Sequence, residues 1–480
     1  MSSAGLSNAR VARLHDVMAS YVERGEVPGL VTLVSRRGET HIEVLGMKAL
    51  GGSDPVQRDT IFRIASMTKP VTAAAAMILV EECKLRLDDP VDGLLPELAD
   101  RQVLKRLDGP LDDTEPAKRA ITLRDLLTLR MGFGMLMVPP DTYPIQTAVD
   151  DLQLGQGLHQ PSLPPEPDEW IRRLGTLPLM HQPGEKWLYH TGSDVLGVLI
   201  ARSSGQAFDT FLQERIFEPL GMKDTAFSVP ASKLDRLATS YATNSETGVL
   251  ELYDPAEDGQ WSRPPAFPSG GVGLVSTVDD YLAFARMMLN QGRHGGRRIL
   301  SRPSVETMTV DHLTAAQKAV SGLISDNSGW GFGVAVVTRR DHVLAGVRAP
   351  GSAQAAVPAV AADRRGRILA TRDDGHAESP AMTVEIAGNE ARRGLLRRSE
   401  VIRRHGFDRR PRQDTLRAVS ALVQHHPAEG EVVVDRRDQA AASRRECRRP
   451  APVATLGRVV QLERSGFEMG RIGRREPVEL

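Results

Sequence analysis

The pattern of apolar and polar positions predicts a helix, a hairpin, a helical middle region and a late strand in the first 345 residues. Apolar side chains recur at helical spacing in residues 8–24, "NARVARLHDVMASYVER". The β-rich runs "GLVTLVSRRG" and "THIEVLGMKAL" follow, and the Arg-Arg-Gly-Glu stretch that joins them predicts a hairpin. Residues 85–265 have mainly helical patterns, and "GWGFGVAVVTRR", 329–340, is a strand candidate. This order predicts an α+β fold, in which both ends of a 1–345 domain build an antiparallel sheet flanked by helices and the helical region is inserted between them.

Four segments give sharper predictions of helices. The run "VTAAAAMILV" has no polar side chain beyond Thr72, so its helix is expected to be buried on all sides. "ITLRDLLTLRMGFG" predicts a helix that Gly132 ends. "GSDVLGVLIARSSGQAFDTFLQERIFEPLGM" predicts two helices with a break at "SGQ". "STVDDYLAFARMMLNQG" predicts a helix capped by Ser276 or Thr277 and ended by Gly292.

Charge divides the 480-residue chain at about residue 345. The chain is 41% hydrophobic, 25% charged and neutral overall, which is typical of a globular protein. Residues 346–480, however, hold 26 Arg, no Lys and 18 Asp or Glu, a net charge of +8, so residues 1–345 carry −8. Only Phe407 and Phe467 are aromatic in this Arg-rich region. Because so few large side chains are available for a core, the region is predicted to be disordered or the product of a shifted reading frame.

The frame hypothesis explains why this region takes the place of fold elements. A shift near residues 341–350 of a gene rich in G and C would give excess Arg, Ala, Pro and Gly and few Lys or aromatic residues. The last strands of the sheet would then be missing. The alternative is a genuine Arg-rich tail that binds an acidic partner, such as a nucleic acid, by electrostatic attraction.

The cysteines, the first residues and the apolar runs of the chain predict no disulfide, targeting or membrane segment. Cys83 and Cys447 cannot form a disulfide framework, and their spacing suggests no metal site. The first 20 residues lack the charged and apolar regions of a signal peptide. No apolar run approaches the roughly 20 residues of a transmembrane helix. The chain is therefore expected to be cytoplasmic and not membrane-bound.

Ser66 and Lys69 form the first candidate for chemistry, in "FRIASMTKPVTAAAAMILV". Residues three apart share a helix face, and Pro70 indicates that the helix begins near Ser66. A serine at this place has its hydroxyl near the positive end of the helix dipole, and its backbone amide can supply half of an oxyanion hole. A half-buried lysine one turn later can act as a base. The alternative is that Ser66 is an N-cap and Lys69 a solvated lysine.

Tyr189 is the second candidate, in "PGEKWLYHTGSDVLGVLI". It follows a Pro-Gly turn and precedes an apolar helix. A tyrosine beside a cationic lysine can take a proton from serine, although a lone tyrosine more often packs against a neighbour, here Trp187. His190 has no obvious acidic partner in the sequence, so an exposed or structural role is expected for it.

Together these stretches resemble the serine β-lactamase superfamily, in particular its class C β-lactamase-like branch of D,D-peptidases, carboxylesterases and acyltransferases. The resemblance covers residues 8–345. Beyond the Ser66 segment it rests on "ITLRDLLTLRMGFG", similar to the family's "hTxRxLLTHTSGL"; on "HQPGEKWLYHTGSDVLGVLI", similar to "PGxxWxYSNxGYxLLG"; and on "SGGVGLVSTVDDYLAFARMML", similar to "GGLxSTxxDxxRF". It implies that Ser66 is the acylated nucleophile, Lys69 its proton partner and Tyr189 the general base.

The sequence departs from the family pattern at two places. Thr191 stands where the tyrosine motif usually has Asn, and its hydroxyl offers a substrate one polar group in place of two. The family's third motif, Lys-Thr-Gly or a His/Trp-x-Gly-Gly variant on a late strand, is absent after "GWGFGVAVVTRRDHVLAGV". The "SGG" at 269–271 comes too early and is assigned to the helix element that follows it.

The resemblance and its departures predict a serine hydrolase that forms an acyl-enzyme, most simply a carboxylesterase for small or medium acyl esters. Met131, Met135 and Met137 are candidates for an apolar wall around the acyl group. No metal or cofactor is expected, and the partner is a small ester or amide. The alternatives are a β-lactamase or D,D-peptidase, and a non-catalytic binding protein that keeps the fold.

Overall fold

The structure is a computed structural model of the whole chain, and it describes residues 6–155, 159–244, 247–319, 324, 328–337, 359–363, 368–371 and 381–387. All of these residues belong to the first of two compact units, Met1–Arg409. The residues of the second unit, Arg410–Leu480, lie outside the described ranges.

The central sheet takes its strands from both ends of the first unit. Its order is β11-β12-β13-β14-β15-β1-β2. The predicted hairpin is confirmed: the first two strands pair antiparallel from Gly29↔Gly46 to Arg36↔Glu39. The bounds of the strands are β1 Gly29–Arg36, β2 Glu39–Gly46, β11 Ser328–Trp330, β12 Ala335–Val337, β13 Ala359–Asp363, β14 Ile368–Thr371 and β15 Ala381–Ala387.

Two features of the sheet differ from the sequence-based expectation. The sheet is mixed, because β1 pairs parallel with β15 and β12 pairs parallel with β13, whereas the other neighbours are antiparallel. Strands β13 to β15 also come from the Arg-rich region, which was expected to leave the sheet without its last strands. Their alternating or apolar runs, such as "AMTVEIA", have the β-branched residues that strands favour. The predicted α+β class, with helices inserted between strands from the two ends, is confirmed.

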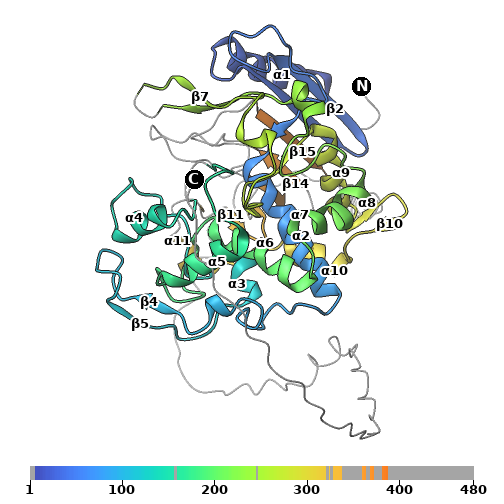
Figure 1. Cartoon of the computed structure of the whole chain (residues 1–480). Coiled ribbons are helices and arrows are strands. Elements are labelled where there is room, and N and C mark those ends of the chain that lie inside the picture. Colours follow the sequence, from blue (N-terminus) through green and yellow to red (C-terminus); the bar gives the residue numbers. More distant parts are fainter. Residues whose placement is uncertain are drawn as a thin grey trace, which may run out of the picture. The chain divides into compact units, whose positions relative to one another are not determined.

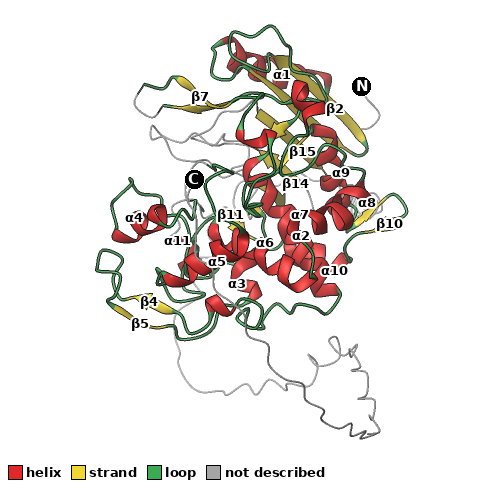
Figure 2. Ribbon diagram, in the orientation of Figure 1, coloured by secondary structure: helices red, strands yellow, loops and turns green. Residues whose placement is uncertain are grey.

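Helices cover the sheet and fill the middle of the chain. Helix α1 (Asn8–Glu23), as predicted, packs against β1 and β2, and α9 (Val278–Leu289) packs against β1 and β15. In Figure 2 the helices α2, α3, α5 and α6 group together below β14 and β15. The bounds of the other helices are α2 Thr68–Glu81, α3 Leu123–Leu127, α4 Pro144–Asp151, α5 Pro167–Thr176, α6 Thr191–Ser204, α7 Phe208–Leu212, α8 Glu218–Leu220, α10 Arg302–Met308 and α11 Ala315–Ala319.

The short strands outside the central sheet form small sheets of their own. Four small two-stranded sheets are β3 with β8, β4 with β5, β6 with β7, and β9 with β10. Their bounds are β3 Phe62–Arg63, β4 Gln102–Leu104, β5 Thr114–Pro116, β6 Ser240–Thr243, β7 Leu250–Asp254, β8 Val275–Ser276, β9 Arg293–His294 and β10 Arg297–Arg298. Helices α7 and α8 are joined by one π-helical turn, Gln213–Phe217, so the predicted second helix after "SGQ" is irregular but present.

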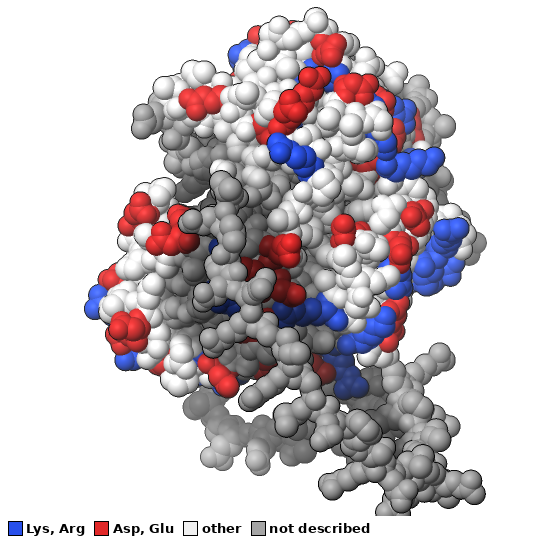
Figure 3. All heavy atoms as spheres, in the orientation of Figure 1, with Lys and Arg blue, Asp and Glu red and all other residues white. Residues whose placement is uncertain are grey.

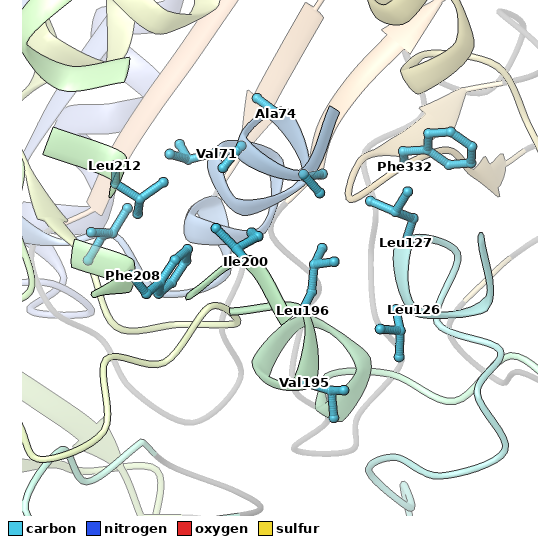
Figure 4. Close-up of a cluster of buried hydrophobic side chains, with 14 of the residues drawn as sticks. Val71, Ala74, Leu126, Leu127, Val195, Leu196, Ile200, Phe208, Leu212 and Phe332 are labelled. Atoms are coloured by element: carbon cyan, nitrogen blue, oxygen red, sulfur yellow. The ribbon is translucent and has the colours of Figure 1, made fainter. Parts of the chain in front are cut away.

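The core centres on α2 and α6, which lie alongside each other (Figure 1). Residues 68–79 of α2 are all buried, which confirms the helix predicted to be buried on every side. Its alanines keep the helix narrow, so neighbouring elements approach it closely. Figure 4 shows the packing of side chains from α2, α3, α6, α7 and the β11–β12 turn, namely Val71, Ala74, Leu126, Leu127, Val195, Leu196, Ile200, Phe208, Leu212 and Phe332.

The structure tests two of the predicted helix ends. Thr277 caps α9 by accepting a hydrogen bond from the backbone of Asp280, which confirms one of the two candidate caps. Helix α3, by contrast, ends at Leu127 and not near Gly132. The reason is that Leu129 has a positive φ of 55°, which breaks the helix two residues later.

The surface carries both charges. Acidic and basic side chains of the described residues are interspersed over the face shown in Figure 3. Within the described residues, no helix is both long and apolar enough to cross a membrane.

Candidate active site

Ser66 lies in a sharp turn immediately before α2. The turn is a 3-10 helix over Ala65–Met67, and Ala65 has a positive φ of 43°. Two hydrogen bonds hold it: the Thr68 hydroxyl donates to the Ala65 carbonyl at 2.7 Å, and the Tyr281 hydroxyl donates to the Met67 carbonyl at 3.1 Å. A strained residue that is supported in this way is typical of a functional site. The turn places Ser66 at the N-terminus of a buried helix, as the sequence predicted.

Lys69 is 1% exposed, and its ammonium group contacts Ser66. Nζ donates to Ser66 Oγ at 2.9 Å and to the Gly271 carbonyl at 2.9 Å. The same Nζ lies 4.4 Å from the centroid of the Tyr189 ring, a cation–π distance. The structure therefore brings the three predicted catalytic side chains together, and it excludes the alternative of a solvated Lys69.

Tyr189 is buried in an aromatic cluster. Its ring lies 5.5 Å from that of Trp187 and 6.0 Å, edge to face, from that of Trp330 in β11. Its backbone carbonyl accepts a hydrogen bond from Met135 N–H at 2.8 Å. Tyr189 thus both packs against Trp187 and faces Lys69, so the two interpretations of this tyrosine are compatible.

Of the two roles expected for His190, exposed or structural, the structure excludes the exposed one. His190 is buried, and its Nε2 lies 3.1 Å from Oδ2 of Asp194, the acidic partner that the sequence did not reveal. Its backbone is also unusual, with φ 83° and ψ −76°. Together with a hydrogen bond of 3.3 Å from Thr191 N–H to the Tyr189 carbonyl, these angles define a γ-turn of the rare, strained kind. Thr191, the predicted substrate-binding residue, is the first residue of α6 and is buried.

The segment Ser269–Gly271 forms one side of the site, although the sequence assigned it only to the following helix element. The Gly270 carbonyl accepts from the Thr72 hydroxyl at 2.8 Å, and the Gly271 carbonyl accepts from Lys69. There is no room for a side chain at Gly270, because a Cβ atom there would lie 2.4 Å from the Ser193 carbonyl oxygen. A glycine at position 270 is therefore required by close packing against α6.

Asp194 is fully buried and accepts several hydrogen bonds. Its Oδ1 accepts from the Ser269 hydroxyl at 2.6 Å and from Gly271 N–H at 3.0 Å. Burial alone would raise the pKa of this carboxyl. The attraction and hydrogen bond of His190, the Ser269 hydrogen bond and the attraction of Lys69 outweigh burial, so that the pKa of Asp194 is lowered. Asp194 therefore carries a negative charge beside the Lys69 ammonium group.

His159 is a further buried imidazole close to these charges. Burial is the main cause that lowers its pKa; Asp194 acts in the opposite direction, His190 and Lys69 act in the same direction as burial, and together they bring the pKa to about 4. Its Nε2 has no hydrogen-bond partner among the described residues. His159 is therefore neutral at neutral pH.

The methionines predicted to form a wall around the acyl group do not share one cluster. Met131 is completely buried and belongs to the main core cluster. Met137, by contrast, packs against the cluster that contains Tyr189, Trp187 and Trp330. Tyr189 thus lies in a buried apolar cluster to which Trp187 and Trp330 contribute the other aromatic rings.

The segment in which the family's third motif was expected lies outside the described residues. The structure describes no residue between Val337 and the start of β13. Asp194 and Ser269 are the site residues that sequence reasoning overlooked. The i, i+4 spacing of His190 and Asp194 on a helix could have indicated their contact. No local pattern could have indicated that Ser269 reaches Asp194, which is 75 positions away.

Comparisons with known proteins agree with this geometry. A family model described as Beta-lactamase matches residues 14–376. The chain is 41% identical over 325 residues to an uncharacterized protein of Mycobacterium tuberculosis, a match that covers 66% of this chain and 76% of the relative. It is 30% identical over 353 residues to Esterase EstB of Burkholderia gladioli, covering 70% and 81%, and 32% identical over 269 residues to the Lovastatin esterase of Penicillium rubens, covering 55% and 62%.

Solved structures share the fold. "EstCE1, a hydrolase with promiscuous acyltransferase activity" matches with a TM-score of 0.59 at 24% identity, covering 82% of this chain and 98% of that one. A mutant of simvastatin synthase from Aspergillus terreus matches with a TM-score of 0.54 at 24% identity, covering 70% and 83%.

Proposed function

Because the chain belongs to the beta-lactamase family, whose members include serine esterases and acyltransferases, we propose that it is a serine hydrolase acylated on Ser66. The preferred reaction is hydrolysis of small or medium acyl esters. The observation that carries the proposal is the buried contact of 2.9 Å between Lys69 Nζ and Ser66 Oγ at the start of α2. A lysine buried to this degree would be costly unless its charge had a specific partner and a task.

In the proposed reaction, the Ser66 hydroxyl oxygen attacks the ester carbonyl carbon. Tyr189 takes the hydroxyl proton, with Lys69 beside both groups, and the proton passes to the departing alcohol. Water then attacks the acyl-enzyme and releases the acid. The positive end of α2 and the Ser66 amide favour the negative charge on the carbonyl oxygen in each transition state.

The aromatic cluster beside Tyr189 suits an acyl chain. Trp187 and Trp330 lie 5.4 Å apart, and Leu313 and Met137 pack against the same cluster. An apolar cluster of this kind, where a substrate reaches it, binds apolar groups without demanding a fixed pattern of hydrogen bonds. The relatives named as esterases support this choice of substrate over a β-lactam or a peptide. A threonine at 191 also offers fewer hydrogen bonds to an amide substrate than asparagine would.

Hydrolysis of p-nitrophenyl butyrate tests the proposal. We expect steady turnover by the wild-type chain and its loss in Ser66→Ala. The matched control is Ser304→Ala, which removes a serine of similar burial from α10 and should leave the rate unchanged. Equal activity of wild type and Ser66→Ala would contradict the proposal.

The alternatives give different results in the same system. Turnover of nitrocefin with little ester hydrolysis would indicate a β-lactamase. Labelling of Ser66 by a fluorophosphonate probe or a fluorescent penicillin without turnover would indicate a binding protein. Relatives named as acyltransferases, such as calJ of Penicillium decumbens, favour acyl transfer as the second candidate. An added alcohol that accepts the butyryl group faster than water does would support it.

A further inference from the structure

We infer that Asp194 is a positioning residue that holds Tyr189 and Lys69 in their mutual geometry, an inference that rests on the proposed function. Asp194 lies in the first turn of α6 and touches neither Ser66 nor Tyr189 in any hydrogen bond of the described residues. It connects two segments that contact the proton-transferring side chains: the γ-turn that follows Tyr189, and the Ser269–Gly271 segment, whose Gly271 carbonyl accepts from Lys69. We refer to Asp194 and the three residues that it connects, His190, Ser269 and Gly271, as the aspartate hub.

The first connection runs through His190. This residue is the centre of the γ-turn, whose backbone angles cost of order 1–3 kcal/mol in a residue other than glycine. Such a conformation persists only when the surroundings hold it. The imidazole is held by Asp194 at 3.1 Å, with both side chains buried. Because Tyr189 is the preceding residue, fixing the turn also fixes the direction of its side chain.

The second connection runs through the Ser269–Gly271 segment. Oδ1 of Asp194 accepts from the Ser269 hydroxyl and from Gly271 N–H, and Ser269 Oγ accepts in turn from the amides of Gly271 and Val272. These bonds fix the peptide plane of Gly271. The carbonyl of the same residue accepts from Lys69 Nζ at 2.9 Å. Asp194 therefore determines where the Gly271 carbonyl, an acceptor of Lys69, lies.

The hub also acts through charge. The charged or titratable groups that face Asp194 are His190, Lys69 and, further away, the neutral His159. An ionised Asp194 attracts the Lys69 ammonium group across a dry interior, where a charge interaction is stronger than in water. Replacing Asp194 by Asn keeps the side-chain shape and an accepting oxygen, but it removes this charge. The variant thus separates the electrostatic role of the hub from packing.

The test compares Asp194→Asn with a matched control, Asp125→Asn. Asp125 is similarly buried, and it accepts from the hydroxyl and backbone N–H of Thr122 and from Arg119. It caps α3, and none of these hydrogen bonds involves a hub residue. We expect Asp194→Asn to lower kcat for p-nitrophenyl butyrate, and the rate of fluorophosphonate labelling of Ser66, by about 10- to 100-fold, the cost of a small misplacement of catalytic groups. KM should stay within about twofold, since the buried Asp194 does not reach the substrate. The control should change kcat by less than about threefold.

A second measurement needs no activity. Thermal unfolding midpoints are compared for Asp194→Asn, Lys69→Met and the double variant, and for the corresponding set with Asp125→Asn. If Asp194 and Lys69 are coupled through Gly271, the double variant loses less than the sum of the two single losses, whereas the Asp125 set is additive.

The outcomes separate the two proposals. Wild-type protein without labelling at Ser66 but with non-additive midpoints would overturn the proposed function and leave Asp194 as the positioning residue. Labelling that Asp194→Asn and Asp125→Asn affect equally would overturn the aspartate hub, and so would additive midpoints for Asp194 and Lys69.

Discussion

Gly134 lies directly against the backbone of Tyr189. A Cβ atom on Gly134 would stand 2.6 Å from the Tyr189 carbonyl oxygen and 2.7 Å from that of Leu188. The next residue, Met135, donates its N–H to the same Tyr189 carbonyl. The loop after α3 therefore contacts the same Tyr189 carbonyl that accepts the hydrogen bond of the γ-turn.

This contact predicts the effect of Gly134→Ala. The methyl group would push the Tyr189 backbone away, because a carbonyl oxygen cannot yield as a flexible side chain can. We expect a loss of about 1–3 kcal/mol in the free energy of unfolding and a lower kcat for ester hydrolysis. Chemical denaturation and steady-state kinetics measure the two effects. Gly93→Ala, at a glycine with open space around its Cα, should change neither.

The buried ion pair of Arg63 and Asp254 is predicted to stabilise the strand that leads to Ser66. Arg63 in β3 contacts the Asp254 carboxylate and donates to the Ala238 carbonyl at 2.6 Å. Arg63→Met would leave the carboxylate buried without its cation and cost about 3–5 kcal/mol of unfolding free energy. Urea denaturation checks this value.

An exposed pair provides the comparison. Arg58 and Asp279 lie 2.7 Å apart, and both side chains are largely exposed. Arg58→Met should therefore cost less than about 1 kcal/mol. Similar losses for the two arginine variants would contradict the role given to burial.

His159 predicts a loss of stability in mild acid. Its pKa is about 4 in the folded chain and about 6.5 when unfolded. Between these values the unfolded state binds the extra proton, so the free energy of unfolding decreases as pH falls from 6.5 towards 4. The full change is about 3 kcal/mol.

The measurement is the urea midpoint at pH 7, 5.5 and 4.5. His159→Gln should reduce the decrease, and His181→Gln should also do so, because burial lowers the pKa of His181 to about 4 as well. His15→Gln, which removes an exposed imidazole, serves as the control. A decrease of unchanged size in His159→Gln would count against a neutral buried imidazole at this position.

The Arg-rich region predicts a shift in the reading frame of the gene. Translation of the nucleotide sequence in the two other frames after codon 340 is expected to reveal a strand with a Gly-Gly motif followed by a closing helix. The Arg-rich composition of residues 346–480 is the reason for this expectation. If neither frame contains these elements, the Arg-rich region, which supplies β13 to β15 of the sheet, is a genuine part of the chain, and salt-dependent retention on heparin becomes the test of its binding to an acidic partner.

The sequence was most informative where one local rule decides the structure. Helical spacing predicted α1, β-rich runs around Arg37-Gly38 predicted the β1–β2 hairpin, and the absence of polar residues predicted that α2 is buried. The Ser66–Lys69 contact also follows from local geometry, because residues three apart at a helix start must lie on the same side.

Other features depend on residues far apart in the chain. The partner of His190 lies in the first turn of the helix that follows it, but only packing by other elements buries that pair. The contact of Asp194 with Ser269, and that of Lys69 with Gly271, join segments whose spacing in the sequence carries no signal. The parallel pairing of β1 with β15 likewise required the folded chain.

The sequence by itself therefore determined the type of fold, the buried helix and the identity of the candidate nucleophile with its lysine. Only the tertiary structure decided what surrounds that lysine, namely the Tyr189 ring, the Gly271 carbonyl and the charge of Asp194. The physical reason is that helix periodicity is set by neighbours within one turn, whereas charge, burial and hydrogen-bond acceptors in a site are supplied by whichever distant segments the packing brings there.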